Sequence, residues 1–296
     1  MSDSEVRAGV RSWLFAPGDS ARKMEKAVRS GADVVLLDLE DSVAEEAKPA
    51  ARKAVAEFLQ ANPAERTRLW VRINPIDGPH GLADLVAICP ARPGGVMLPK
   101  VGGRAEIETV GHYLTALETA AGSTPGEIGL IIVCTETPQA MFAAGDYAGA
   151  PRLAALTWGA EDLATALGAA GNRDDDGDYD FTYKLARSLC LLGAAVVGVP
   201  AIETIHGDFQ DPAGLERVAS AARRAGFSGM IAIHPNQVAT INGAFTPTPE
   251  EVARAREVVA LFDANPSAGT VGHNGAMLDR PHLVRAQLLL KQAGGA

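Results

Sequence analysis

The feature that most constrains the fold of this chain is a repeated alternation of short apolar runs with longer helical stretches. Each run is rich in aliphatic and β-branched residues and is apolar on both faces. The segments between the runs, such as residues 50–59 and 216–225, have the composition and spacing of amphipathic helices. Strands that are apolar on both faces are typical of a parallel sheet covered by helices. We predict strands at residues 12–15, 34–38, 69–73, 95–98, 128–133, 153–158, 195–199 and 228–233.

Eight strand–helix units are what an α/β fold of the (β/α)8 TIM-barrel type requires. Such a barrel takes about 250 residues, and the chain has 296. A doubly wound sheet usually has fewer units and often carries a Gly-x-Gly-x-x-Gly phosphate loop, which the sequence lacks. We therefore predict a TIM-barrel catalytic domain over residues 1–245.

Residues 246–296 are predicted to form a C-terminal helical extension of the barrel. Helical patterns cover residues 249–264 and 281–292, and a glycine-rich segment at 267–275 separates them. Because glycines allow the backbone to move easily, we interpret this segment as a lid.

Composition excludes several classes of protein. The chain has 36 acidic and 27 basic residues, a net charge of -9, and an acidic surface repels nucleic-acid phosphates. The three cysteines are far apart in apolar surroundings, which indicates reduced thiols. No apolar leader is visible, and the longest apolar run, 189–202, is interrupted by glycine and proline and is too short to cross a membrane. We expect a cytoplasmic protein that binds neither nucleic acid nor membrane.

Charged residues follow the predicted strands at the points where those strands end. In a TIM barrel these points surround the active site. Clustered carboxylates repel one another unless a cation neutralises them, and carboxylate oxygens suit a hard ion such as Mg²⁺. Glu136 and Asp162 follow adjacent strands and could share one ion; two solvated or capping carboxylates are the alternative. The charged strand-end residues on this rim are Glu40, Asp41, Arg72, Lys100, Glu136 and Asp162.

Several ordered motifs resemble one known family. The motifs are FAPGD within 11–26, LDLEDSV at 37–43, VRIN at 71–74, MLPKV at 97–101, ETP at 136–138, GAEDL at 159–163, IHPNQ at 233–237 and GAMLDRPH at 275–282. Together they resemble the HpcH/HpaI aldolase/citrate lyase superfamily, and most closely its citrate lyase β-subunit-like (CitE-like) branch, which includes malyl-CoA and citramalyl-CoA lyases. The resemblance covers about residues 11–290.

The resemblance implies a Mg²⁺-dependent carbon–carbon lyase acting on acyl thioesters. Glu136 and Asp162 would hold the metal, and Arg72 would bind substrate oxygens and stabilise the developing enolate. Glu40 and Asp41 would hold metal-bound waters or orient Arg72; an ion pair of Arg72 with either carboxylate is also a purely structural interpretation. Asp279 would transfer a proton, reaching into a neighbouring subunit of a homo-oligomer (a trimer or hexamer). The alternative for Asp279 is an N-cap of the last helix.

The same resemblance suggests contacts for coenzyme A. Phe15 would pack near the cofactor, and Lys26 matches a phosphate-contacting lysine. A position that often holds arginine in relatives is Ser20 here, so Arg22 would substitute for it. Glu161 and His234 are further candidates for the pocket wall. The alternatives are solvated helix charges for Arg22 and Lys26, and a helix cap for His234.

Two other motifs are set aside. Residues 172–177 imitate the start of a calcium loop, but the twelfth position of that loop would be Tyr183 instead of an acidic residue. A solvated acidic loop is the preferred interpretation, and a substrate-gating loop is the alternative. Lys100 could suggest a Schiff-base aldolase, but that chemistry needs a desolvated lysine with a lowered pKa.

Three activities remain open within the family. The first is reversible cleavage of a 3-hydroxy-acyl-CoA such as malyl-CoA or citramalyl-CoA into an acyl-CoA and a 2-oxo acid. The second is cleavage of a free 4-hydroxy-2-oxo acid, as in a class II aldolase. The third is that of a citrate lyase β subunit acting on citryl-acyl carrier protein. A barrel that only binds coenzyme A or an organic acid is the non-enzymatic alternative.

Overall fold

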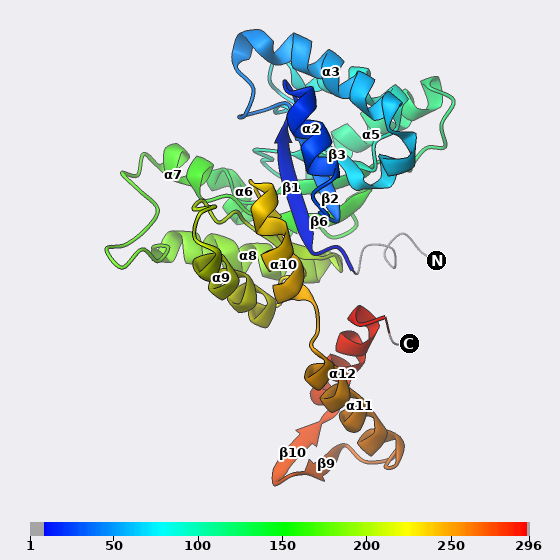
Figure 1. The fold of residues 1–296 in the computed structure, drawn as a ribbon, viewed down its shortest axis with the longest axis vertical. Coiled ribbons are helices and arrows are strands. Elements are labelled where there is room, and N and C mark those ends of the chain that lie inside the picture. The colour runs from blue at the N-terminus through cyan, green and yellow to red at the C-terminus, as the bar shows by residue number, and fades with distance from the viewer. Residues whose placement is uncertain (1–8, 295–296) are drawn as a thin grey trace. The chain divides into compact units, whose positions relative to one another are not determined.

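The computed structural model describes residues 9–294, and its first part is a closed barrel of eight parallel strands (Figure 1). Each strand pairs with the next one in the chain, and β8 pairs with β1 through Trp13 and Ile231. The predicted TIM barrel is therefore confirmed. The strands are β1 (Ser12–Pro17), β2 (Val34–Asp38), β3 (Leu69–Arg72), β4 (Gly95–Leu98), β5 (Gly129–Val133), β6 (Leu153–Thr157), β7 (Ala201–Glu203) and β8 (Gly229–Ala232).

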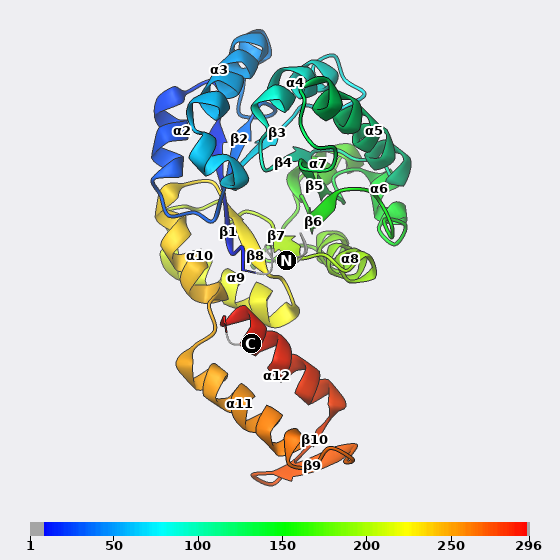
Figure 2. The same cartoon turned by 90° about the vertical axis from the view of Figure 1, so that its right-hand side faces the viewer.

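Helices surround the barrel, as Figures 1 and 2 show. The α-helices that accompany the strands are α2 (Ala21–Val28), α3 (Lys48–Ala61), α4 (Gly81–Ile88), α5 (Arg104–Ala120), α6 (Pro138–Ala143), α7 (Glu161–Leu167), α8 (Phe181–Val197), α9 (Pro212–Ala225) and α10 (Val238–Phe245). Short 3₁₀ turns are η1 (Glu45–Ala47), η2 (Pro63–Arg68), η3 (Cys89–Ala91) and η4 (Pro235–Gln237).

The strand predicted at residues 195–199 is wrong. That segment is the end of α8, and β7 begins at Ala201. The apolar run 189–202 contains both elements, and hydrophobicity alone does not separate a buried helix from a buried strand. Gly198 separates them, because its φ of +79° closes the helix in the left-handed conformation that glycine favours.

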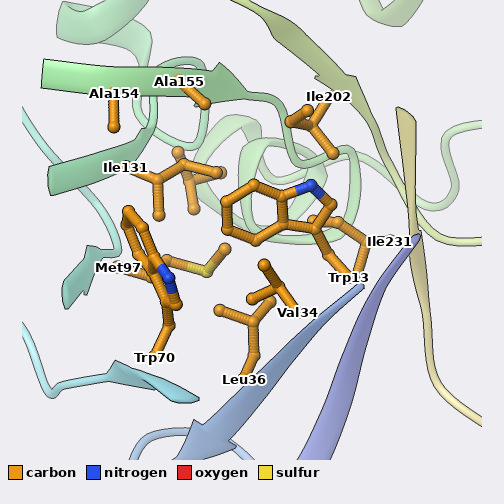
Figure 3. Close-up of a cluster of buried hydrophobic side chains, with 11 residues drawn as sticks. Trp13, Val34, Leu36, Trp70, Met97, Ile131, Ala154, Ala155, Ile202 and Ile231 are labelled. Carbon is orange, nitrogen blue, oxygen red and sulfur yellow. The ribbon is translucent and has the colours of Figure 1, made fainter. Parts of the chain in front are cut away.

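The interior of the barrel is filled by large side chains (Figure 3). Trp13 and Trp70 meet edge to face with ring centroids 5.3 Å apart, and Met97 and Ile131 pack around them. Gly95 makes room for the second indole, since a Cβ at this position would lie 2.2 Å from the Trp70 ring. This packed core holds the strands in place, and so it fixes the positions of their C-terminal ends, where the charged residues lie.

The chain divides into two compact units between Asn242 and Gly243, within α10. The domain boundary that we expected after residue 245 lies at the end of the same helix and stays a prediction. The second unit contains α11 (Pro249–Asp263), β9 (Thr270–His273), β10 (Ala276–Asp279) and α12 (Arg280–Gln292), and Figure 2 shows its two helices lying antiparallel. Its small core is formed by Phe262, Val271 and Leu283.

The glycine-rich segment that we interpreted as a lid forms a β-hairpin. Asn274 and Gly275 both have positive φ, 48° and 78°, which is the conformation of an Asn-Gly hairpin turn. The Asn-Gly pair was the sequence signal for this turn. Movement of the hairpin as a lid stays a prediction.

Among residues 9–294, none of the helices is both long and apolar enough to span a bilayer.

Candidate active site

The C-terminal ends of the barrel strands surround a cavity of about 410 Å³. This is the end of a TIM barrel that carries active sites. Of the residues proposed from the sequence, those that line the cavity are Phe15, Asp41, Arg72, Glu136, Glu161 and Asp162. The loops after β6 and β7 add Tyr179, Thr204 and Ile205, which the sequence analysis did not single out.

Arg72, the last residue of β3, is held by a carboxylate that the sequence analysis did not assign. Its Nε and Nη2 donate to Asp38 at 2.7 Å each, so the pair is bidentate. Burial raises the pKa of Asp38, but the charge and hydrogen bonds of Arg72 outweigh burial and hold it below its ordinary value. Asp38 ends an apolar strand as the other rim residues do, and that signal could have identified it.

The third guanidinium nitrogen of Arg72 faces the two predicted carboxylates. Nη1 lies 2.8 Å from Glu40 and 3.3 Å from Asp41, and the Phe15 ring lies 4.6 Å from the guanidinium carbon. The expected ion pairs of Arg72 are therefore present. Together with Asp38 they hold the guanidinium of Arg72, which lines the cavity, in one position.

Lys100 lies between three carboxylates that follow two strands, β2 and β6. Its Nζ is 2.5 Å from Glu40, 3.1 Å from Asp162 and 3.7 Å from Asp41. Burial lowers the pKa of Lys100, but Glu40 and Asp162 outweigh burial and raise it above its ordinary value. A permanently protonated amine lacks the lone pair that a Schiff base requires. The geometry therefore favours the metal route over a lysine aldolase.

The backbone of Lys100 positions the first predicted metal ligand. Lys100 has a φ of +54°, which is strained for a residue with a side chain, and its amide donates to Glu136 Oε2 at 2.6 Å. Burial raises the pKa of Glu136 to about 8, and the charges of Asp162 and Glu40 add to this rise. The Lys100 amide and the Lys100 charge lower the pKa of Glu136 but do not outweigh burial.

The residues fit a magnesium ion. Glu136 and Asp162 line the same cavity, and Mg²⁺ usually takes only one or two protein carboxylates and completes its shell with water and substrate. Within residues 9–294 no group of three or more His, Cys, Asp and Glu side chains is arranged to hold a metal ion. Gly159 leaves space beside Glu136, because a Cβ there would lie 2.9 Å from Glu136 Cγ and 3.0 Å from Oε1.

This close approach gives a test of the metal site. Gly159→Ala is expected to displace the Glu136 carboxylate and to lower Mg²⁺ affinity about 10- to 100-fold, the effect typical of disturbing a ligand's support. Titration calorimetry of the folded variant measures this. Gly171→Ala is the matched control, since a Cβ there meets nothing within 4 Å. Equal Mg²⁺ affinity in the two variants would contradict the assignment.

A buried network holds the turn that carries Glu40. Lys48 Nζ donates to the carbonyl oxygens of Leu39 and Glu40 at 3.2 and 3.1 Å, and to Asn74 Oδ1 at 2.6 Å. Asn74 Nδ2 donates in turn to the Leu39 carbonyl at 2.8 Å and to Asp84 at 2.7 Å. None of these supports was found from the sequence, because the partners lie up to 35 residues apart.

The other proposed contacts lie away from the lining of this cavity. Arg22 and Lys26 are exposed on α2. His234 caps η4 by accepting from the Asn236 amide, stacks on Phe209 at 5.0 Å, and lines a second hollow of about 460 Å³. The cap interpretation of His234 is thus realised, and its role in the pocket wall stays a prediction.

Asp279 caps α12 in the second unit. It accepts from the His282 amide and contacts the His282 ring, and these hydrogen bonds lower its pKa. The structural alternative that we gave for Asp279 is therefore present. A proton-transfer role in a neighbouring subunit stays a proposal.

The motifs, the barrel and the rim of charged residues are features of one family. A model of the HpcH/HpaI aldolase/citrate lyase family matches residues 11–235. The chain belongs to this family. Membership in this family of lyases and aldolases makes the protein an enzyme, and it confirms the resemblance drawn from the motifs.

Members of the HpcH/HpaI family with known names are similar over nearly the whole chain. The mitochondrial citramalyl-CoA lyase of Rattus norvegicus is 33% identical over 96% of this chain and 86% of its own. The (3S)-malyl-CoA thioesterase of Cereibacter sphaeroides is 32% identical over 96% of this chain and 94% of its own. The crystal structure of Mycobacterium tuberculosis CitE with magnesium, acetoacetate and coenzyme A superimposes with a TM-score of 0.78, at 34% identity over 97% of this chain and 99% of that one.

Proposed function

We propose that the protein is a Mg²⁺-dependent carbon–carbon lyase that cleaves or forms a 3-hydroxy-acyl-CoA, such as malyl-CoA or citramalyl-CoA. The products of cleavage are an acyl-CoA and a 2-oxo acid. The observation that carries the proposal is one cavity lined by Arg72 and by the carboxylates Glu136 and Asp162. The citramalyl-CoA lyase relative and the CitE complex with magnesium and coenzyme A support it.

The reaction moves one proton and one electron pair. The hydroxyl of the substrate loses its proton, and its oxygen becomes the carbonyl of the oxo acid while the adjacent carbon–carbon bond breaks. The electron pair of that bond passes to the thioester as an enolate, which takes up a proton at carbon. Negative charge therefore develops at the thioester oxygen, and this is where a fixed cation has its largest effect.

The described residues divide this work between them. Glu136 and Asp162 would hold the ion, which supplies a Lewis acid and a template when it is bound. Arg72, held rigidly by Asp38, Glu40 and Asp41, binds the substrate oxygens and stabilises the enolate.

The remaining roles are proposals carried over from the family motifs. Phe15 and Glu161 line the cavity and would contact the thioester portion. Arg22 and Lys26, which are exposed, would contact the phosphates of coenzyme A, and His234 would border the entrance. Asp279 of a neighbouring subunit would move the proton, in a homo-oligomer that works in the cytoplasm.

A substrate panel tests the reaction. The purified protein is supplied with CoA thioesters, citryl-acyl carrier protein and free 4-hydroxy-2-oxo acids, with Mg²⁺ or with EDTA. We expect release of oxo acid from a CoA thioester in the presence of Mg²⁺, and at least about 10³-fold less in EDTA, because a metal contributes several kcal/mol to such a transition state.

The products distinguish the alternatives. Release of free coenzyme A without oxo acid indicates thioester hydrolysis. Cleavage confined to the free acids indicates an aldolase, and cleavage confined to the carrier-protein substrate indicates a citrate lyase β subunit. If none of the thioesters is cleaved in an EDTA-sensitive reaction, the proposed function is wrong.

A further inference from the structure

The acidic loop between α7 and α8 is a folded element. Tyr179 forms an antiparallel bridge with Arg173, and the Asp174 amide donates to the Asp178 carbonyl at 2.8 Å. The Asp174 carboxylate accepts from the amides of Asp176 and Asp178 at 3.2 and 2.9 Å. The first carboxylate of the apparent calcium motif, at its third position, is thus engaged by the loop's own backbone.

The residue that this loop delivers to the cavity is Tyr179. Its ring meets Trp158 edge to face with centroids 5.1 Å apart, and the Arg173 guanidinium lies 3.9 Å from the ring centroid. The tyrosine is therefore held by an aromatic contact and by a cation–π contact. Its position is set by the loop and by β6 together.

The support behind Tyr179 is buried and charged. Trp158 Nε1 donates to Glu203 at 2.5 Å, and Arg187 of α8 donates to the other oxygen of Glu203 at 2.7 Å. Trp158 and Glu203 are only 1% and 2% exposed. A buried carboxylate with satisfied partners holds its neighbours in one geometry. Trp158, against which Tyr179 packs, is consequently held in one geometry.

The charged residues that line the cavity stand at the ends of β2, β3, β5 and β6, and they include Arg72, Glu136 and Asp162. On the side of the barrel that β7 and β8 supply, the lining carries no charged residue among those described and is mostly apolar: it consists of Tyr179, Thr204, Ile205, Ile231 and Ile233. Apolar side chains contribute to binding only by removing apolar ligand surface from water, so this side suits an alkyl group.

We propose that Tyr179 is a specificity-determining residue that limits the size of the alkyl group on the 2-oxo acid. The orientation of the substrate in this inference rests on the proposed function, in which the oxo acid is bound at the metal held by Glu136 and Asp162. Trp158, the support of Tyr179, precedes Asp162 by four residues on the same β6 loop. Because Tyr179 and Asp162 line the same cavity, the substituent of an oxo acid bound there would reach the tyrosine, and the substrate class is a 2-oxo acid with a small alkyl group.

The test compares Tyr179→Ala with the wild type on 2-oxo acids of increasing size. The ligands are pyruvate, 2-oxobutanoate and 3-methyl-2-oxobutanoate, and the readouts are calorimetric affinity with Mg²⁺ and the rate of condensation with acetyl-CoA. One methylene in an apolar pocket changes selectivity about 10- to 200-fold. We expect Tyr179→Ala to raise the ratio of the affinity for the largest acid to the affinity for the smallest acid at least about tenfold.

Control variants separate the effect of removing the Tyr179 side chain from the cavity from a general loss of structure. Tyr179→Phe retains the ring and is expected to keep the wild-type order of affinities, and Tyr179→Leu, which retains apolar packing, is expected to give an intermediate shift. Tyr113→Ala, at an exposed tyrosine of α5, removes the same side chain away from the cavity and should leave the ratio unchanged.

The two readouts distinguish this inference from the proposed function. A shifted affinity ratio without any condensation would support the role of Tyr179 and contradict the lyase. Condensation with an unchanged ratio in both Tyr179→Ala and Tyr179→Leu would overturn the role of Tyr179 and leave the lyase standing. The role of Tyr179 would also be overturned if the wild type bound all three acids with equal affinity, or if it bound none of them.

Discussion

Glu136→Gln is expected to abolish measurable Mg²⁺ binding and to lower kcat/KM for thioester cleavage by about 10³-fold or more. The substitution keeps the shape of the side chain but removes the negative charge that a divalent cation requires. A metal that acts as a Lewis acid is worth several kcal/mol of transition-state stabilisation, and 1.36 kcal/mol corresponds to a factor of ten. Calorimetric Mg²⁺ titration and steady-state kinetics measure the two effects.

Glu118→Gln provides the matched control for this variant. Glu118 is also a buried carboxylate, 1% exposed, but it pairs with Arg152 at 2.7 Å and does not line the cavity. Its replacement should lower the free energy of unfolding and leave Mg²⁺ affinity unchanged. If Glu136→Gln retains wild-type Mg²⁺ affinity, Glu136 is not a metal ligand.

Arg72→Met is expected to remove most of the activity and to destabilise the barrel. Activity should fall about 10²- to 10³-fold, because a fixed donor to a developing oxyanion is lost. The free energy of unfolding should fall by about 3–5 kcal/mol at neutral pH, since Asp38 remains buried without its bidentate partner. Urea unfolding and steady-state kinetics give both values.

The pH dependence of this loss identifies its cause. In the wild type, Arg72 holds the pKa of Asp38 below its ordinary value, so the pair stabilises the fold above the unfolded-state pKa, about 3.9. That contribution is lost as the pH falls through the lowered folded-state pKa. In Arg72→Met the buried Asp38 takes up a proton at a higher pH, so the difference in stability between the two proteins should shrink on acidification.

A double variant completes this test. Asp38→Asn combined with Arg72→Met removes the uncompensated charge, so we expect it to recover part of the stability and none of the activity. A stability difference that stays constant from pH 7 to pH 4 would show that the loss arises from packing alone.

The rim residues were predictable because strand ends have a fixed place in a barrel. Arg72, Glu136 and Asp162 stand at or just beyond the ends of apolar runs, and closure of the sheet brings such positions into one ring. The misplaced β7 shows where this reasoning fails. The apolar run from Leu189 to Ile202 contains both the end of α8 and the start of β7, and the left-handed Gly198 marks where the helix ends.

The partners of the rim residues were less predictable. Asp38 and Arg72 are 34 residues apart, and Trp158 and Glu203 are 45 apart. Nothing in the local pattern states which carboxylate faces which cation. Tyr179 was missed for the same reason: its loop has the composition of an ordinary acidic surface loop, and only the structure shows its contact with Trp158.

The sequence by itself determined the alternation of strands and helices, the parallel barrel that follows from it, and the identity of the charged groups at the strand ends. These depend on burial and polarity along the chain, which the order of residues records directly. Only the tertiary structure decided that Asp38 holds Arg72, that Lys100 lies between three carboxylates, and that Tyr179 lines the same cavity as Arg72. Those relations depend on distances through space between residues remote in the chain, and they are set when the barrel closes.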